Sequence, residues 1–388
     1  MTTDRSTKGE RMQGRSEKVR AWTGAMLLLA AAMTAGAAPV AGSSDAGKAV
    51  APQHLLVDVT VTDAQGKPEM DLSPFDFHLM DNGKAQRVLA VQKAGWMVPG
   101  AATAPEMVLV LDAVNLSFEK MQLERQDVQN FLRRDGGRLP VPTRVAMLTD
   151  TKLIESAEPT TDGNQLAKFI DRNPNPVHSL RFQAGYYGEL DRATWSMDQL
   201  YKLAQSEQQR PGRKLVVWIS HGWHPLARDY LAMSKEDLQR DYAMVVGLTN
   251  ALLRARITLV SLDPILDLPG ENLNYYKAFL PPVTSWQHVD TPNLLLQVLA
   301  QHSGGMVLDQ STNIEGEIRQ AMQVLRGWYT LAYTPTSAAS GETGSAGKSG
   351  ATDQSVFHAI QVTVGSGQPT GQAAVKVMAP VGYYWSAR

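Results

Sequence analysis

The stretch MVLVLDAVNLS, residues 107–117, decides the fold of this 388-residue chain. Its first five residues are apolar, Asp112 ends the run, and a turn then leads into a segment with the spacing of a helix. Such a strand delivers its aspartate to the carboxyl edge of a parallel sheet, where side chains from neighbouring strand ends converge and α/β folds bind ligands. We therefore expect the functional site around Asp112.

Four further apolar runs continue this pattern. They are RVAMLTD at 144–150, KLVVWIS at 214–220, RITLVSLD at 256–263 and the short GMVLD at 305–309. Their near-continuous apolar character is typical of strands buried on both faces. Segments with apolar residues three and four positions apart lie between and after them, at 118–134, 235–254 and 314–325, and predict helices. The alternation predicts an α/β domain over residues 105–327, with a doubly wound, mostly parallel sheet.

Both flanks of this domain show the period of two that half-buried strands have. In residues 54–98, LLVDVTVTD (55–63) alternates apolar and polar residues, and FHLMDNGKAQRVLAV (77–91) predicts two strands joined by a hairpin turn through Asp81, Asn82 and Gly83. Residues 328–388 contain WYTLAYTP, FHAIQVTVG and AAVKVMAP, and the Gly- and Ser-rich residues 336–354 predict a disordered loop. Because neither piece has enough strands to be stable alone, we expect one small β-sandwich formed by both.

The first 37 residues have the features of an export signal. Basic residues at 18 and 20 precede an apolar run over 21–35, and Ala-Gly-Ala at 35–37 supplies the small residues at which a signal peptidase cuts. The competing interpretation is a transmembrane anchor, but the run is short for a bilayer span of about 20 apolar residues. We predict a cleaved signal over 1–37 that starts at Met1 or Met12, a flexible tether over 38–53, and export to the periplasm or beyond the cell.

The composition argues against several classes of function. Lys and Arg total 37 against 38 Asp and Glu, so no global field recruits nucleic acid or an anionic membrane. The chain has no cysteine, which excludes a disulfide framework, a thiol nucleophile and a lipid-anchored cysteine. Stability must therefore come from packing alone.

Six segments, taken in order, resemble the VWFA-related family common in Acidobacteria, which is built on a von Willebrand factor type A domain. They are VTVTDAQGKPEMDLSPFDFHLMDNGK (59–84), LVLDAVNLS (109–117), KLVVWISHGWH (214–224), LLLQVLAQHSGGMVLD (294–309), YTLAYTP (329–335), and FHAIQVTV (357–364) with GYYW (382–385). The resemblance implies an exported protein whose type A domain is a doubly wound sheet with β elements on either side. It implies no particular activity.

Many type A domains bind Mg²⁺ or Mn²⁺ at a metal-ion-dependent adhesion site, so the resemblance implies a motif Asp-x-Ser-x-Ser with one carboxylate and two hydroxyls. Asp112 matches the carboxylate, but positions 114 and 116 hold valine and leucine, and His221 replaces a second carboxylate. A divalent cation would have to use Asp112, Asn115, Ser117 and His221 in a degenerate site, and imidazole suits Zn²⁺ better than Mg²⁺. We therefore expect no cofactor, and we favour Asp112 as a residue that caps a helix or orders a turn.

These observations predict a non-catalytic binding or adhesion module that presents its carboxyl edge to an unidentified protein partner. The predicted contact residues are Asp112, Asn115, Ser117, His221 and Trp223, whereas Trp218 lies inside a strand and is predicted to be core. One alternative is an α/β-hydrolase-like enzyme, which HGWHP superficially suggests, but the Gly-x-Ser-x-Gly nucleophile elbow is absent. The other alternative is a structural scaffold of the cell envelope.

Overall fold

The computed structural model describes residues 54–98, 104–174, 185–223, 233–264, 274–309, 311–335, 355–365 and 375–386. The predicted signal at 1–37, the tether at 38–53 and the loop at 336–354 lie outside the described residues. Residues Ala51–Arg388 form one compact unit. Within the described ranges no helix has both the length and the apolar character that a bilayer span requires.

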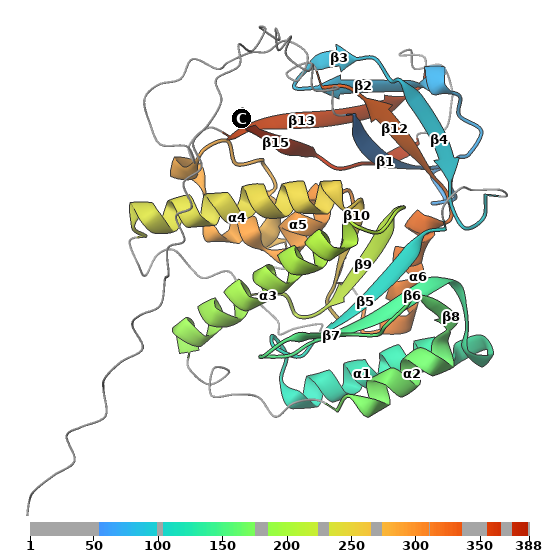
Figure 1. The fold of residues 1–388 in the computed structure, drawn as a ribbon, viewed down its shortest axis with the longest axis vertical. Coiled ribbons are helices and arrows are strands. Elements are labelled where there is room, and N and C mark those ends of the chain that lie inside the picture. Colours follow the sequence, from blue (N-terminus) through green and yellow to red (C-terminus); the bar gives the residue numbers. More distant parts are fainter. Residues whose placement is uncertain are drawn as a thin grey trace, which may run out of the picture. The chain divides into compact units, whose positions relative to one another are not determined.

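The apolar runs form the central sheet, in the order β11-β10-β9-β5-β6-β7, with β8 also paired to β6 (Figure 1). Its strands are β5 (Glu106–Asp112), β6 (Arg138–Leu148), β7 (Leu153–Glu155), β8 (Thr160–Asp162), β9 (Lys214–Ile219), β10 (Ile257–Leu262) and β11 (Met306–Leu308). The pairs β5–β6, β5–β9, β9–β10 and β10–β11 are parallel, and only β7 and β8 pair antiparallel, both to β6. The fold is thus mixed α/β with a mostly parallel sheet.

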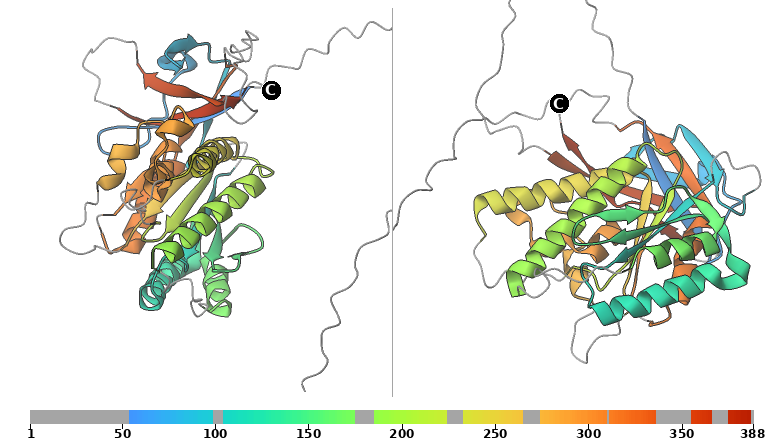
Figure 2. Two further views of the ribbon diagram at one scale, coloured as in Figure 1. Left: turned by 90° about the vertical axis from the view of Figure 1, so that its left-hand side faces the viewer. Right: turned by 60° about the horizontal axis from the view of Figure 1, so that its bottom comes forward.

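Helices cover both faces of this sheet because successive strand residues point to opposite sides. Met107, Leu109 and Leu111 pack with α1 (Phe118–Arg133), α2 (Gly163–Arg172) and α6 (Ile314–Met322). Val108 and Val110 pack on the other side with α3 (Gly185–Glu207), α4 (Lys235–Arg254) and α5 (Leu296–His302). Figure 2 shows the two helical layers from other directions. Short 3-10 helices lie at Pro74–Asp76, Arg134–Gly137, Tyr275–Phe279, Trp286–His288, Thr291–Leu294 and Gln323–Leu325.

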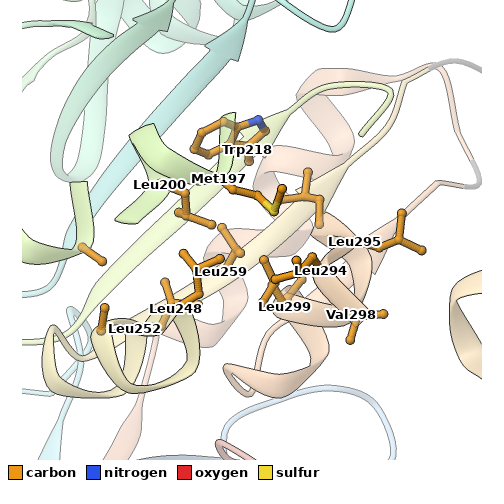
Figure 3. Close-up of a cluster of buried hydrophobic side chains, with 14 of the residues drawn as sticks. Met197, Leu200, Trp218, Leu248, Leu252, Leu259, Leu294, Leu295, Val298 and Leu299 are labelled. Atoms are coloured by element: carbon orange, nitrogen blue, oxygen red, sulfur yellow. The ribbon is translucent and has the colours of Figure 1, made fainter. Parts of the chain in front are cut away.

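The second of these cores surrounds Trp218, which is fully buried in β9 (Figure 3). Leucines of α4 and α5 and Met197 of α3 gather beside it, as Figure 3 shows. Burial of Trp218 confirms its prediction as a core residue. A large aromatic ring next to the carboxyl end of β9 also places an indole N–H beside the predicted site.

Two four-stranded antiparallel sheets make up the remaining β structure of the described residues. Their orders are β14-β1-β12-β4 and β15-β13-β2-β3. The strands are β1 (Leu55–Thr62), β2 (Phe77–Asp81), β3 (Lys84–Gln86), β4 (Ala90–Ala94), β12 (Trp328–Tyr333), β13 (Ser355–Val364), β14 (Lys376–Met378) and β15 (Gly382–Ser386). Strands from before and after the α/β region therefore pair directly: β1 with β12 and β14, and β2 with β13.

The two small sheets share one buried cluster. Val57 of β1 and Leu331 of β12 belong to the first sheet, and Leu79 of β2 and Ile360 of β13 belong to the second. Each of these four side chains is at most 5% exposed. The core of either sheet thus depends on residues from both ends of the described chain.

The hairpin prediction needs one correction. Asn82 and Gly83 form the predicted two-residue turn, with φ of 51° and 76°, and Asp81 pairs with Lys84 across it. After Gln86, however, the chain leaves this sheet, and β4 pairs with β12 in the other one. The single strand predicted after the turn is two strands in different sheets.

Strand β6 begins six residues earlier than the run at 144–150 predicts. The extension contains Pro140 and Pro142, which usually argue against a strand because proline has no N–H to donate. Pairing of β6 with β5 starts only at Thr143, opposite Met107, so neither proline lies in that ladder. The prolines are therefore tolerated.

Two arginines, of which Arg213 is buried and Arg256 partly exposed, join the small sheets to the central sheet. Arg213 is 2% exposed, and it donates from Nε to Thr258 of β10 at 3.0 Å and from Nη1 to Thr60 of β1 at 2.8 Å. Arg256, after α4, donates to both carboxylate oxygens of Asp58 in β1, at 3.0 and 2.7 Å. The bidentate contact of Arg256 with Asp58 fixes the relative orientation of the two side chains as well as their distance, because the planar guanidinium matches the two carboxylate oxygens.

Candidate functional site

The order of the central sheet places its topological switch point at the carboxyl ends of β5 and β9. Numbered along the domain without β8, the strands run 3-2-1-4-5-6, and the order reverses between the first strand, β5, and the fourth, β9. In doubly wound sheets ligands bind at this switch point, outside the strand ends. Asp112 ends β5, and Ser220 and His221 follow β9, so the two predicted segments meet there.

Asp112 is fully buried, and protein groups satisfy its carboxylate. Oδ1 accepts hydrogen bonds from the backbone N–H groups of Val114 at 2.9 Å and Asn115 at 3.2 Å. Oδ2 accepts from Asn115 Nδ2 at 2.7 Å and from Trp218 Nε1 at 2.9 Å. Burial raises the pKa of Asp112, and these hydrogen bonds oppose the shift without reversing it. The aspartate therefore orders the turn after β5.

The other residues of this turn also have structural partners. Asn115 Nδ2 donates to Ser196 of α3 at 2.8 Å as well as to Asp112. Ser117 is the N-cap of α1, and its hydroxyl accepts from the backbone N–H of Lys120. Val114 and Leu116, at the positions where the family motif has hydroxyls, are 5% and 1% exposed and pack in apolar clusters.

His221 pairs with an aspartate from the neighbouring strand. Its Nδ1 lies 3.0 Å from Oδ2 of Asp263, which follows β10, and the side chains are 14% and 8% exposed. Gly222 then adopts φ of 76°, a conformation that suits glycine, and its N–H donates to the hydroxyl of Ser220. This pair is the main polar feature on the β9 side of the switch point.

The prediction of Trp223 as a partner contact is wrong. Its side chain is 3% exposed, its Nε1 donates to the carbonyl of Leu294, and its ring meets Trp218 edge to face at 5.7 Å. Phe118, the first residue of α1, lies beside the turn and is 47% exposed. An aromatic residue that follows a strand in loop-like sequence can pack inward as readily as outward, so the sequence alone did not separate these two.

Glu124 is an acidic residue of the site that the sequence analysis missed. It lies on α1, is 2% exposed, and neither of its carboxylate oxygens has a hydrogen-bond partner among the residues that the structure describes. Burial raises the pKa of Glu124 well above its ordinary value, and the negative charges of Asp112 and Asp263 raise it further. A signal was present: position 124 falls between Met121 and Val128 on the buried stripe of the helix.

A hard cation such as Mg²⁺ does not fit this donor set. Both oxygens of Asp112 already accept two hydrogen bonds each, and the two motif positions offer apolar side chains. Burial lowers the pKa of the Arg192 guanidinium on α3, and the negative charge of Asp112 opposes this shift, so a positive charge already lies near Asp112. Among the described residues, no group of three or more His, Asp or Glu side chains is arranged to hold a metal.

Comparison with known proteins identifies no family. No protein-family model matches the chain, and no curated protein sequence matches it. Among solved structures, proximal thread matrix protein 1 from the mussel byssus is similar over 63% of this chain and 51% of its own, at 11% identity and a TM-score of 0.34. The human COPII-coat protein Sec24c is similar over 83% of this chain and 47% of its own, at 8% identity and a TM-score of 0.29. The chain thus spans about half the length of each.

Proposed function

We propose that this protein is an exported, non-catalytic binding module with a von Willebrand factor A-like domain. In this proposal the carboxyl edge of the central sheet recognises a protein partner without a tightly held metal ion. The strand order with its short antiparallel strand at the β6 edge supports the architecture, together with the sequence resemblance. The switch point between β5 and β9 supports the location of the site.

The observation that carries the proposal is the saturated carboxylate of Asp112. Four protein donors surround its two oxygens, so a metal ion would have to displace hydrogen bonds that also order the turn. The cost of leaving such buried donors unpaired is about 1–3 kcal/mol each. A partner is therefore recognised by the outer side of this turn and by apolar contact, rather than through a bridging cation.

Phe118 is the anchor that we assign to this surface. Its ring is exposed directly after Ser117, and large exposed aromatic side chains are among the residues that contribute most to binding energy. Asn115, Ser117 and His221 are partly exposed around the same strand ends and supply polar contacts at the rim. In this proposal Trp223 does not contact the partner, because its side chain is buried and donates to the carbonyl of Leu294.

A pull-down from cell-envelope extract tests the proposal. The bait is the chain from residue 38, in parallel reactions with and without EDTA, as wild type and as Phe118→Ser. We expect a specific partner that is retained in EDTA and reduced at least tenfold by Phe118→Ser. Val356→Ser is the matched control, because Val356 is 55% exposed on β13 and should leave capture unchanged.

Loss of the partner on chelation would show that a metal participates after all. Retention by Phe118→Ser would show that the carboxyl edge is not the contact surface. Release of a cleaved or hydrolysed product during incubation would favour the enzyme alternative, in which His221 and Asp263 would form an acid–base pair.

A further inference from the structure

A cavity lies at the opposite edge of the central sheet. It has a volume of about 200 Å³ and is lined by residues that follow β4, end α1, begin β6 and end α6. Helix α1 starts at the carboxyl end of β5 and ends where β6 begins, so this cavity lies at the amino end of β6. It shares no residue with the site around Asp112 and His221.

The cavity combines an apolar wall with several guanidinium groups. Trp96, Phe131 and Met322 form part of the apolar wall, and Phe131 and Met322 are each 6% exposed. Trp96 is 39% exposed, which leaves part of its ring available at the rim. Ligand pockets have this composition, a mainly apolar lining with a few well-placed polar groups.

Three arginines line the same cavity, and their charges are only partly balanced. Arg134 and Arg319 both bind one oxygen of Glu315, so one carboxylate serves two guanidinium groups. Arg138 forms no ion pair and no side-chain hydrogen bond with the described residues. Asp135 also lines the cavity. The three arginines, Asp135 and Glu315 together carry a formal net charge of +1, and the guanidinium of Arg138 is available to an anion.

The walls are held in place before any ligand arrives. Gly95 has φ of 144°, and a Cβ there would lie 2.3 Å from the carbonyl oxygen of Arg326, so only glycine lets the Trp96 turn approach this closely. The backbone N–H of Trp96 then donates to the carbonyl of Leu325 at 3.1 Å. On the other side, Asn164 Nδ2 donates to the carbonyl of Gly136 at 2.9 Å and fixes the turn between α1 and β6.

We propose that this cavity binds the carboxyl terminus of a peptide whose last residue is apolar or aromatic. The side chain of that residue packs against Trp96, Phe131 and Met322, and its carboxylate pairs with Arg138. The volume suits one residue rather than a folded surface, and exposed Pro140 and Gln323 in the lining mark an opening through which the rest of the peptide leaves. Arginine suits this role because its planar fork binds both oxygens of a carboxylate.

Calorimetry with the full chain and acetyl-Gly-Gly-Phe tests the proposal. We expect a Kd on the order of 10⁻⁴ M for the free carboxylate, in keeping with a single anchored residue. The same peptide with a carboxyl-terminal amide, and acetyl-Gly-Gly-Gly with a free carboxylate, should each bind at least tenfold more weakly. Acetyl-Phe has the same side chain and free carboxylate but no preceding glycines. If it binds as tightly as acetyl-Gly-Gly-Phe, the cavity takes a free acylated amino acid instead of a peptide terminus.

Two variants locate the binding. Arg138→Gln should weaken acetyl-Gly-Gly-Phe about tenfold, because it removes the unpaired guanidinium. Arg133→Gln is the matched control, since Arg133 is the neighbouring exposed arginine of α1 but pairs with Asp171 and does not line the cavity. Equal affinity for the acid and the amide, or binding that Arg138→Gln leaves unchanged, would overturn the proposal, as would the absence of any heat at millimolar peptide.

Discussion

Glu124 gives the site a pH dependence of its own. Burial is the main cause that raises the pKa of this carboxyl in the folded state, above an ordinary value of 4.5. The folded protein therefore holds the proton more tightly than the unfolded chain, so stability is full below the ordinary pKa and falls as the pH rises towards the raised one. The slope approaches about 1.4 kcal/mol per pH unit for one proton.

Replacement of Glu124 by glutamine should remove this contribution to the slope. Urea unfolding between pH 5 and pH 8 should show wild type losing stability as the pH rises, while Glu124→Gln loses less and becomes the more stable of the two at the upper end. A residual slope stays in the variant, because the pKa of Asp112 is also raised by burial. Glu119→Gln, on the exposed first turn of the same helix, should behave as wild type. Parallel curves for wild type and Glu124→Gln would contradict the assignment.

Asp112 leads to a prediction about metal. Calorimetric titration with Mg²⁺ should give no binding tighter than about millimolar, because the ion would have to dehydrate for oxygens that already accept hydrogen bonds. Micromolar binding that disappears in Asp112→Ala would instead show that the turn rearranges around a cation. A fluorescence or circular dichroism spectrum of Asp112→Ala should accompany the titration, because loss of the four hydrogen bonds also loosens the turn.

At the scale of elements, the shared cluster of the two small sheets couples strands that lie far apart in the sequence. Leu79 of β2 is 2% exposed, so Leu79→Ala should lower the free energy of unfolding by about 3 kcal/mol. Hydrogen exchange should then accelerate in β13, which pairs with β2, and also in β12, which belongs to the other sheet. Val356→Ala, on the exposed side of β13, should change neither, and a response confined to β13 would argue against one common core.

The elements differ in how far the sequence predicted them. Helix α4 has the bounds that its apolar spacing indicates, and a capping box of Ser234 and Asp237 marks its start. The three-residue strands β7 and β8 were missed, because so short a segment carries no measurable period. At the site, Asp112 follows from its place at a strand end, whereas the partners of its carboxylate depend on which side chains the neighbouring strand and helix bring there.

For the whole molecule, the features of residues 1–37 lead to a prediction about processing. Mass spectrometry of protein from the native host should find an amino terminus between about residues 38 and 43, because cleavage follows the small residues at 35–37. An intact amino terminus recovered in a membrane fraction would support the anchor instead. Expression with residue 35 changed to a bulky side chain should slow the cleavage.

The pairing of β1 with β12 has a consequence for the order of folding. Asp58 and Thr330 are hydrogen-bonded although 272 positions separate them in the chain. Both partner strands of β1, β12 and β14, follow the α/β region in the chain, so β1 can pair only after that region has been added. All strands of the central sheet lie between β4 and β12 in the chain, so we expect the central sheet to form before the two small sheets close.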